Sequence, residues 1–182
     1  MSVTPSAPAL ELSSSRAPVA AIVYPDNAYP DATFETLVRR GRERGLSLAG
    51  VLQHRVFETV DRRCDVVLED LTTGHRTAIF EDRGTGAAGC RLDEAALAEA
   101  TARIEGNLED GPDLLALNKF GKAECDGGGL LDLIGNAIDR GIPVIIGVPK
   151  SNLGAWRSFA GDLAVELTSA VDDVERWLGS LR

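Results

Sequence analysis

The sequence predicts one α/β domain in three layers, with a mainly parallel sheet covered by helices on both faces. Short, wholly apolar runs such as residues 18–24 (PVAAIVY) and 143–148 (PVIIGV) are typical of strands that are buried on both sides of a parallel sheet. These runs alternate with segments whose apolar residues recur at helical spacing, and this alternation is typical of βαβ units. A chain of 182 residues is long enough to bury one substantial core.

The first predicted unit is a strand, a helix and a second strand. After the strand 18–24, residues 31–45 carry apolar residues on one face and arginines on the other, which indicates an amphipathic helix. Asp31 is expected to cap its start and Gly45 to end it. Residues 47–53 (SLAGVLQ) form the second strand, and the connection between these parallel strands is expected to be right-handed.

An inserted β-hairpin interrupts this alternation. Residues 64–71 (CDVVLEDL) and 75–81 (HRTAIFE) are β-rich and are joined by a glycine-containing turn, which indicates antiparallel pairing. A glycine-rich loop, residues 82–90, follows. The clearest helix is residues 92–108, which Asp93 is expected to cap. The remaining elements are expected as strand 113–118, helix 129–140, strand 143–148, helix 151–160, strand 163–167 and helix 171–181.

Composition and charge exclude several classes of protein. The net charge of −9 disfavours a broad nucleic-acid surface, which needs excess Lys and Arg, and it disfavours an anionic membrane surface for the same reason. No apolar run is long enough for membrane insertion. Residues 1–17 lack the features of a signal peptide and have the composition of a disordered tail, which leaves 18–182 as the domain. Three cysteines without a CxxC pair indicate reduced thiols in a cytoplasmic protein.

The loop after the first strand, PDNAYPDATFETL, lacks the parts of a phosphate-binding loop. Nucleotide-binding α/β proteins carry GxxxxGK[ST] at this place, where the glycines and the lysine hold the phosphates. This sequence has no glycine or lysine between Tyr24 and Gly41, and Asp26 and Asp31 would repel a triphosphate. A degenerate phosphate loop is therefore predicted, in the form of an ordinary surface loop. Binding of a partner at the free amides of the following helix is the alternative.

The strongest candidate site lies in residues 114–134 (LLALNKFGKAECDGGGLLDLI), where a buried strand leads into a helix. Two lysines follow the strand and three glycines precede the helix, namely Lys119, Lys122, Gly127, Gly128 and Gly129. Two cations, a glycine-rich backbone and a helix N-terminus at the carboxyl edge of the sheet favour binding of an oxyanion or phosphate. A flexible connection with solvated lysines is the alternative. The NKFG stretch lacks the aspartate of the guanine-reading NKxD motif, so guanine recognition by that route is rejected.

Arg91 is the third predicted cation of this site. It lies in GCRLD, where a glycine-rich loop meets a helix, and its guanidinium can bind an anion, while Cys90 is a candidate ligand or redox-active thiol. The alternative is a helix cap by Asp93, with Arg91 in a surface ion pair. The side chains expected around the anion are Asn118, Glu124, Asp93, Cys90 and Gln53. His54 and His75 have no metal-ligand spacing, so no metal site is predicted.

Six stretches in chain order, AGVLQ, DLTTG, GCRLD, DLLALNKFGKAE with GGGL, IPVIIGV and AWRSFAG, resemble a bacterial family of unknown function whose genes often lie beside molybdate-transport or nitrogenase genes. The resemblance covers residues 19–167. The layout also resembles, more distantly, small P-loop nucleoside-triphosphatases, in which an acidic DEIG occupies the place of residues 118–121 and a later acid that of Glu124. Asn118 and Lys119 replace the acidic pair that interacts with magnesium and water. The resemblance therefore implies that the fold is retained and the catalytic activity is lost.

These observations together predict a non-catalytic, cytoplasmic regulatory or accessory protein that binds a small anion or nucleotide. The resemblance implies molybdate, tungstate or a nucleotide as the ligand, and a protein partner in molybdenum uptake or metalloenzyme maturation. One alternative is a weak nucleotide hydrolase, in which Glu124 or Asp126 acts as base or metal ligand and Lys119 supplies the missing cation. The other alternative is a protein-interaction subunit without a small-molecule ligand.

Overall fold

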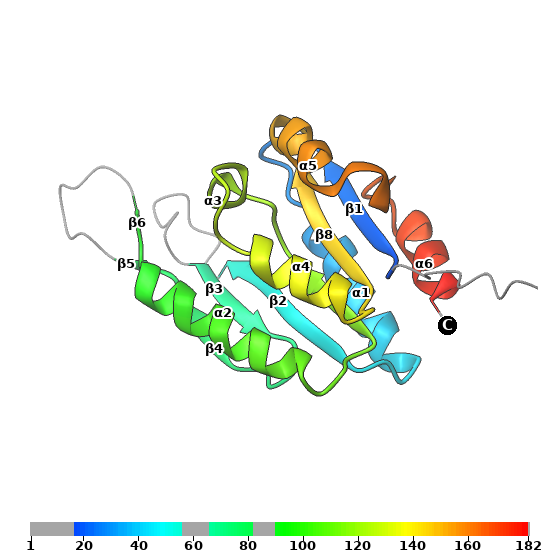
Figure 1. Ribbon diagram of the computed structural model, residues 1–182, viewed down its shortest axis with the longest axis horizontal. Coiled ribbons are helices and arrows are strands. Elements are labelled where there is room, and N and C mark those ends of the chain that lie inside the picture. The colour runs from blue at the N-terminus through cyan, green and yellow to red at the C-terminus, as the bar shows by residue number, and fades with distance from the viewer. Residues whose placement is uncertain (1–16, 56–65, 82–89, 182) are drawn as a thin grey trace, which may run out of the picture.

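The computed structural model describes residues 17–55, 66–81 and 90–181, and a seven-stranded sheet forms its centre (Figure 1). The spatial order of its strands is β4 (Arg76–Ala78), β3 (Val66–Asp70), β2 (Leu48–Arg55), β7 (Leu114–Leu117), β8 (Val144–Pro149), β1 (Val19–Tyr24) and β9 (Ala164–Leu167). In the part of this order that runs from β2 to β9, each strand is parallel to the next one. The sheet is therefore mainly parallel, as predicted.

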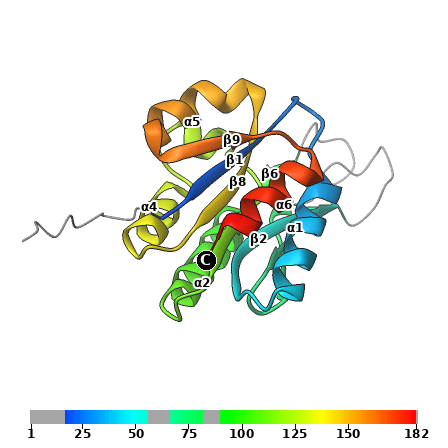
Figure 2. The same cartoon turned by 90° about the vertical axis from the view of Figure 1, so that its right-hand side faces the viewer.

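Helices cover both faces of the sheet, and Figure 2 shows α1 and α6 on one side with α2 and α4 on the other. The helices are α1 (Asp31–Glu43), α2 (Glu94–Leu108), α4 (Leu131–Asp139), α5 (Leu153–Ala160) and α6 (Val171–Ser180). Phe34 and Trp177 are buried in the core beneath α1 and α6. Ile104, Ile134 and Trp156 are buried in the core beneath α2, α4 and α5. Two apolar cores thus enclose the sheet, which confirms the predicted three-layer α/β fold.

Strands β3 and β4 form the predicted hairpin at one edge of the sheet, and β3 is antiparallel to both β4 and β2. Buried Asp70 organises the turn, because its Oδ1 accepts hydrogen bonds from the amides of Thr72 at 2.8 Å and Thr73 at 3.3 Å. The side-chain amide of Asn107 in α2 also donates to both carboxylate oxygens. A buried carboxylate needs such donors, so the DLTTG stretch ties the hairpin to α2.

One predicted strand, residues 75–81, is divided in the structure. After β4 ends at Ala78, Ile79 turns into the core and is only 7% exposed. Phe80–Glu81 (β5) then pairs with Arg91–Leu92 (β6) in a separate two-stranded sheet. The carbonyl of Ile79 accepts a hydrogen bond from the amide of Asp93 at 2.8 Å, which holds the start of α2 beside this turn. The prediction of one continuous strand was wrong because burial of Ile79 redirects the chain.

The helix ends follow the sequence signals in two of three cases. Asp93 caps α2 as predicted, and its carboxylate accepts a hydrogen bond from the amide of Ala96 at 2.9 Å. Gly45 follows the end of α1, and its amide donates to the carbonyl of Arg42. Asp31, however, is the first residue of α1 and not its cap, because Pro30 occupies the capping position without a side-chain hydrogen bond.

Strands β2 and β7 approach each other closely at Gly50. Its φ is +114°, and a Cβ built on it would overlap with the carbonyl group of Ala116 in β7. The carbonyl of Gly50 accepts a hydrogen bond from the amide of Leu71 at 2.9 Å. Glycine is therefore required where the parallel part of the sheet meets the hairpin.

Some predictions fall on residues outside the described part of the chain. They concern the tail, residues 1–16, the start of the hairpin at Cys64 and the glycine-rich loop, residues 82–89. Ala17, which was assigned to the tail, is buried. Among the described residues, no helix has both the length and the apolar character that crossing a bilayer requires.

Candidate anion-binding site

A cavity of about 280 Å³ lies beside the loop that follows β7. Its polar lining includes Asn118, Lys119, Lys122 and Glu124 of this loop and Gln53 of β2. Apolar side chains of β2, β3 and α2 contribute to the remaining wall. In parallel α/β folds, ligands bind at the carboxyl ends of the strands, where loops of neighbouring strands meet. The structure thus brings these five predicted residues together at the expected edge.

Lys119 and Lys122 supply the positive charge of the cavity. Both are exposed, and neither forms an ion pair within the described residues. Hydrogen bonding by Ser151, followed by the charges of Lys119 and Lys150, lowers the pKa of Asp26 in the loop between β1 and α1. Lys150 directly follows β8 and is a further cation of this edge. The sequence signal for it, a lysine immediately after a buried apolar strand, resembles the one that indicated Lys119.

Asn118 and Gln53 form an amide pair in the cavity lining. Nδ2 of Asn118 donates a hydrogen bond to Oε1 of Gln53 at 3.0 Å, and Asn118 is only 6% exposed. Oδ1 of Asn118 and Nε2 of Gln53 have no other hydrogen-bond partner in the described ranges. A few fixed polar groups in an otherwise apolar lining are what orients a ligand in a pocket. The pair can therefore offer both a donor and an acceptor to a bound molecule.

Glu124 is buried, and both of its carboxylate oxygens are used within the loop. Oε2 accepts a hydrogen bond from the amide of Gly121 at 2.8 Å, and Oε1 accepts one from the amide of Leu130 at 2.9 Å. These bonds close the loop around a short helix, α3 (Lys122–Cys125), which the sequence did not predict. Gly129 has a φ of +60°, and a Cβ on it would overlap with the Glu124 carboxylate. Glycine at this position therefore allows the carboxylate to reach Leu130.

The amides of two predicted glycines are also used inside this loop. The amide of Gly127 donates to the carbonyl of Glu124 at 3.1 Å, and the amide of Gly128 donates to that of Ala123 at 2.9 Å. Hydrogen bonds of this kind satisfy the amides locally. The predicted cradle of glycine amides is therefore not formed by Gly127 and Gly128 in this structure, and the two lysines and the amide pair remain as the polar groups of the site.

Arg91, Cys90 and Asp93 line an adjoining hollow of about 490 Å³ and not the cavity itself. Nε of Arg91 lies 3.8 Å from Oε2 of Glu81, which corresponds to the predicted surface ion pair. Glu81, Asp93 and Glu94 bring three carboxylates to this hollow, and their charge disfavours an anion. Cys90 takes part in a disulfide, so the expectation of reduced thiols is wrong for this residue.

Cys125 of α3 is a free thiol beside the cavity loop. Burial, and then the nearby carboxylates of Asp126 and Glu124, raise the pKa of this thiol. A raised pKa keeps the thiol protonated and weakly nucleophilic. In the part of the chain that the structure describes, no group of three or more His, Cys, Asp or Glu side chains is placed to hold a metal ion.

Aromatic rings fill the region where β1 leads into α1. The rings of Tyr24 and Tyr29 meet edge to face with centroids 5.6 Å apart, and Tyr29 stacks on Phe34 at 5.4 Å. The hydroxyl groups of both tyrosines are buried and have no hydrogen-bond partner among the described residues. A phosphate-binding loop needs open backbone amides at this place. The aromatic cluster of Tyr24, Tyr29 and Phe34 therefore favours the predicted degenerate loop.

The two tyrosines, which are the only ones in the chain, should remain un-ionised until the protein unfolds at alkaline pH. Burial raises the pKa of both phenols, more than the nearby charges do. Because the folded pKa lies above the unfolded value of about 10, the neutral phenols stabilise the fold fully below that pH. This contribution is lost as the pH rises further. Tyrosinate absorbance and far-ultraviolet circular dichroism should therefore change together in an alkaline titration. Ionisation near pH 10 with intact circular dichroism would contradict the burial of the cluster.

Residues 19–177 match a family described as "Protein of unknown function (DUF2478)", and this match covers most of the chain. The chain belongs to this family. The resemblance to a bacterial family of unknown function, inferred above from six short stretches, is thereby confirmed. The match begins at the first residue of β1, as predicted, and extends beyond the predicted end at residue 167 into α6.

A relative of this DUF2478 chain is the "Molybdenum import ATP-binding protein ModC 2" of Bradyrhizobium diazoefficiens, which is 32% identical over 159 residues. These residues are 87% of this chain but 18% of the relative. The similarity therefore concerns a small part of that protein.

Two solved structures share the fold of this DUF2478 chain. THEP1 from the hyperthermophile Aquifex aeolicus has a TM-score of 0.65 and 16% identity, covering 90% of this chain and 99% of its own. A human cancer-related nucleoside triphosphatase has a TM-score of 0.67 and 13% identity, and the match covers 91% of this chain and 100% of the triphosphatase. At these identities the likeness concerns the fold alone, and it agrees with the three-layer α/β scaffold that the sequence predicted.

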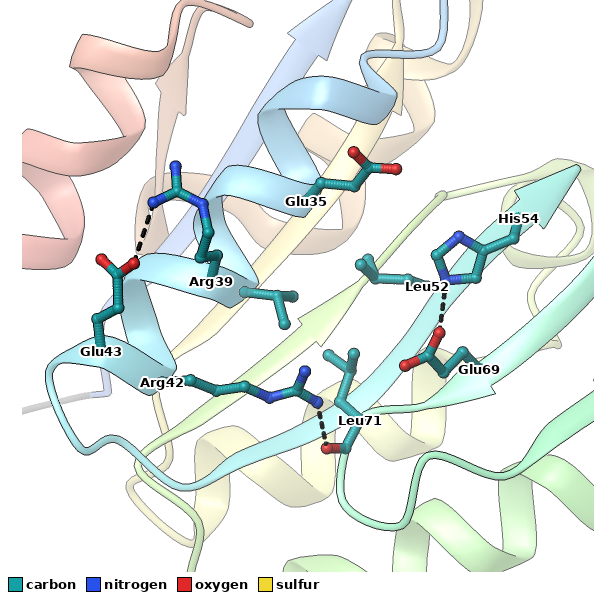
Figure 3. Close-up of a pocket in the computed structure, with 9 residues that line it drawn as sticks. Glu35, Arg39, Arg42, Glu43, Leu52, His54, Glu69 and Leu71 are labelled. Atoms are coloured by element: carbon teal, nitrogen blue, oxygen red, sulfur yellow. Dashed lines mark hydrogen bonds and ion pairs between the residues drawn. The ribbon is translucent and has the colours of Figure 1, made fainter.

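A second hollow, of about 390 Å³, lies between α1 and the hairpin side of the sheet (Figure 3). Most of its charged groups are already engaged with one another or with the backbone. The contacts are Arg39 with Glu43 at 3.1 Å, His54 with Glu69 at 2.8 Å, and Arg42 with the carbonyl of Leu71 at 3.1 Å. Its guanidinium groups are engaged, whereas the two lysines of the cavity form no ion pair among the described residues, so the cavity is the better candidate for an anion.

Proposed function

We propose that this protein binds a small anion through Lys119 and Lys122 and acts as a non-catalytic accessory or regulatory protein in molybdenum uptake. The observation that carries the proposal is a pair of ammonium groups beside a cavity of about 280 Å³, which form no ion pair with the residues that the structure describes. Two local cations can dominate a pocket even when the whole chain has a net charge of −9. The candidate anions are molybdate, tungstate, phosphate and nucleotides.

The absence of catalysis is supported by three features of the same edge. Phosphoryl transfer needs a cradle for the phosphates and acidic groups that hold magnesium. The distant resemblance to small P-loop nucleoside-triphosphatases implies that Asn118 and Lys119 replace their acidic pair. The carboxylate of Glu124 is buried and holds two backbone amides, which speaks for a structural role and against a free base. The aromatic cluster occupies the entry to α1.

The link to molybdenum rests on the relative from Bradyrhizobium diazoefficiens. In that protein the matching residues belong to a longer chain that is named as a molybdenum import ATP-binding protein. A segment that belongs to the same polypeptide as such a protein is held next to it. We therefore propose an ATP-binding import protein as the partner and the cytoplasm as the location.

The anion site can be tested by thermal unfolding in the presence of phosphate, sulfate, molybdate, tungstate, AMP and ATP. A ligand that binds only the folded state raises the melting temperature by mass action. At a concentration 100 times its Kd, the expected rise is about 5–10 °C for a chain of this length. The double variant Lys119→Ala/Lys122→Ala should lose this rise, because it removes both cations.

The control is a double variant that removes two cations elsewhere, Arg140→Ala/Arg176→Ala. In the structure these arginines contact Asn136 and Asp173 within their own helices. The control changes the net charge by the same amount as the lysine variant and should retain the rise. An equal rise in the lysine variant would remove Lys119 and Lys122 from the site, and no rise with any of the anions would overturn the proposed function.

A further inference from the structure

Beside the lysines that can bind an anion, the cavity has an apolar lining that a bare oxyanion would not use. Besides the two lysines, it is lined by Val51, Leu68, Ile79, Phe80, Leu92 and Leu97. Its volume of about 280 Å³ is about nine times the ~30 Å³ share of one water molecule. A tetrahedral oxyanion would fill only part of this space and would leave the apolar wall in contact with water. The lining therefore fits a ligand with an apolar body attached to its anionic group.

The amide pair adds a polar recognition point to this apolar wall. Because Asn118 and Gln53 are hydrogen-bonded to each other at 3.0 Å, the orientation of both amides is fixed. Oδ1 of Asn118 remains as an acceptor and Nε2 of Gln53 as a donor. Asn and Gln amides pair with the edges of nitrogen heterocycles that present a donor next to an acceptor. A planar heterocycle would use these groups and also cover the apolar wall with its ring.

Asp26 limits the number of phosphate groups that the site can take. Its Oδ1 accepts a hydrogen bond from the amide of Ser151 at 3.1 Å, which holds the carboxylate at the carboxyl ends of β1 and β8, the same edge of the sheet as Lys119. A chain of phosphates that extended from Lys119 toward the loop between β1 and α1 would approach this carboxylate and be repelled. A single phosphate beside Lys119 and Lys122 avoids that repulsion.

We infer that the ligand is a flat nitrogen heterocycle that carries one phosphate group and is about the size of a nucleoside monophosphate. This rests on the anion site proposed above and narrows its ligand. The phosphate binds Lys119 and Lys122, the edge of the ring binds the amides of Asn118 and Gln53, and the face of the ring lies on the apolar wall. A nucleoside monophosphate and a heterocyclic phosphate without ribose share this chemistry.

Isothermal titration calorimetry with the full chain at fixed salt tests this inference. The probes are AMP, GMP, CMP and UMP, pyridoxamine phosphate as a heterocyclic phosphate without ribose, and ribose 5-phosphate, inorganic phosphate, molybdate and ATP. At least one heterocyclic monophosphate should bind about tenfold tighter than ribose 5-phosphate, since it makes the additional ring and amide contacts. If the tightest probe is a nucleotide, the ligand is a nucleoside monophosphate. If it is pyridoxamine phosphate, the ligand is a heterocyclic phosphate without ribose.

Two variants separate the parts of the site. Gln53→Met keeps the length of the side chain and removes its hydrogen bonds. It should therefore lower the affinity for the tightest heterocyclic monophosphate by about tenfold and leave the affinity for inorganic phosphate unchanged. Lys119→Ala/Lys122→Ala should lower the affinity for the heterocyclic monophosphate and for inorganic phosphate. If inorganic phosphate or molybdate binds as tightly as any heterocycle and depends on the lysines, the inference fails while the proposed function stands. Tighter binding of ATP than of AMP would also overturn the inference. If no probe binds, both are wrong.

Discussion

Replacement of Gly50 by alanine is expected to destabilise the protein by at least about 4 kcal/mol. The reason is the overlap of the new Cβ with the carbonyl group of Ala116, at a φ of +114° that alanine adopts only with strain. Both atoms belong to strands in the middle of the sheet, so neither backbone can move aside without breaking the pairing of β2 with β7. Urea unfolding followed by circular dichroism measures the change as a lower midpoint.

The matched control for this substitution is Gly106→Ala in α2. A Cβ at Gly106 meets no atom within 4 Å, and the residue lies inside a helix. Alanine should therefore stabilise the protein by about 0.5–1 kcal/mol through its higher helix propensity. If Gly50→Ala unfolds at the same urea concentration as the wild type, β2 and β7 are not paired as the structure has them.

Removal of the Glu124 carboxylate should have the next largest effect, a loss of about 3 kcal/mol in the free energy of unfolding for Glu124→Ala. Two backbone amides, of Gly121 and Leu130, lose their acceptor in a loop where Glu124 is only 8% exposed. Glu124→Gln keeps one carbonyl oxygen and turns an NH₂ group toward the other amide, so its loss should be about half as large. Urea unfolding of the two variants gives both values.

These two variants also separate the structural role of Glu124 from a catalytic one. If Glu124 were the base of a hydrolase, Glu124→Gln would abolish turnover of nucleoside triphosphates and leave stability unchanged. The control is Glu105→Ala on the exposed face of α2, which should change the free energy of unfolding by less than about 0.5 kcal/mol. Equal stability of Glu124→Ala and Glu105→Ala would show that the Glu124 carboxylate does not hold the loop.

The parts of the fold that the sequence predicts well are those with local signals. β1 and β8 appear as apolar runs because both faces of a central parallel strand are covered, and α2 carries its own cap in Asp93. The division of residues 75–81 could not be predicted in this way. Ile79 looks like any strand residue in the sequence, and only its burial against distant elements turns the chain out of the sheet.

The candidate site shows the same difference between local and tertiary information. Lys119 and Lys122 follow a buried strand, so their place at the carboxyl edge could be predicted. Gln53 was also expected around the anion, but its direct hydrogen bond with Asn118 depends on β2 lying next to β7, which no local pattern shows. Arg91 was expected beside the lysines but pairs with Glu81 in the small second sheet. The glycines after α3 suggested free amides, yet the same composition also suits a loop that satisfies its amides internally.

The placement of the two tryptophans gives the molecule an internal optical reporter. Trp156 belongs to the core beneath α5 and Trp177 to the core beneath α6, so their emission reports on opposite faces of the sheet. The ring of Trp156 meets Phe120 edge to face at 5.4 Å, and Phe120 directly follows Lys119. When Trp177 is replaced by phenylalanine, the remaining tryptophan fluorescence comes from Trp156. Its indole contacts Phe120, the neighbour in sequence of the proposed ligand-binding residue Lys119. Occupancy of the cavity can then be followed in solution without an added dye.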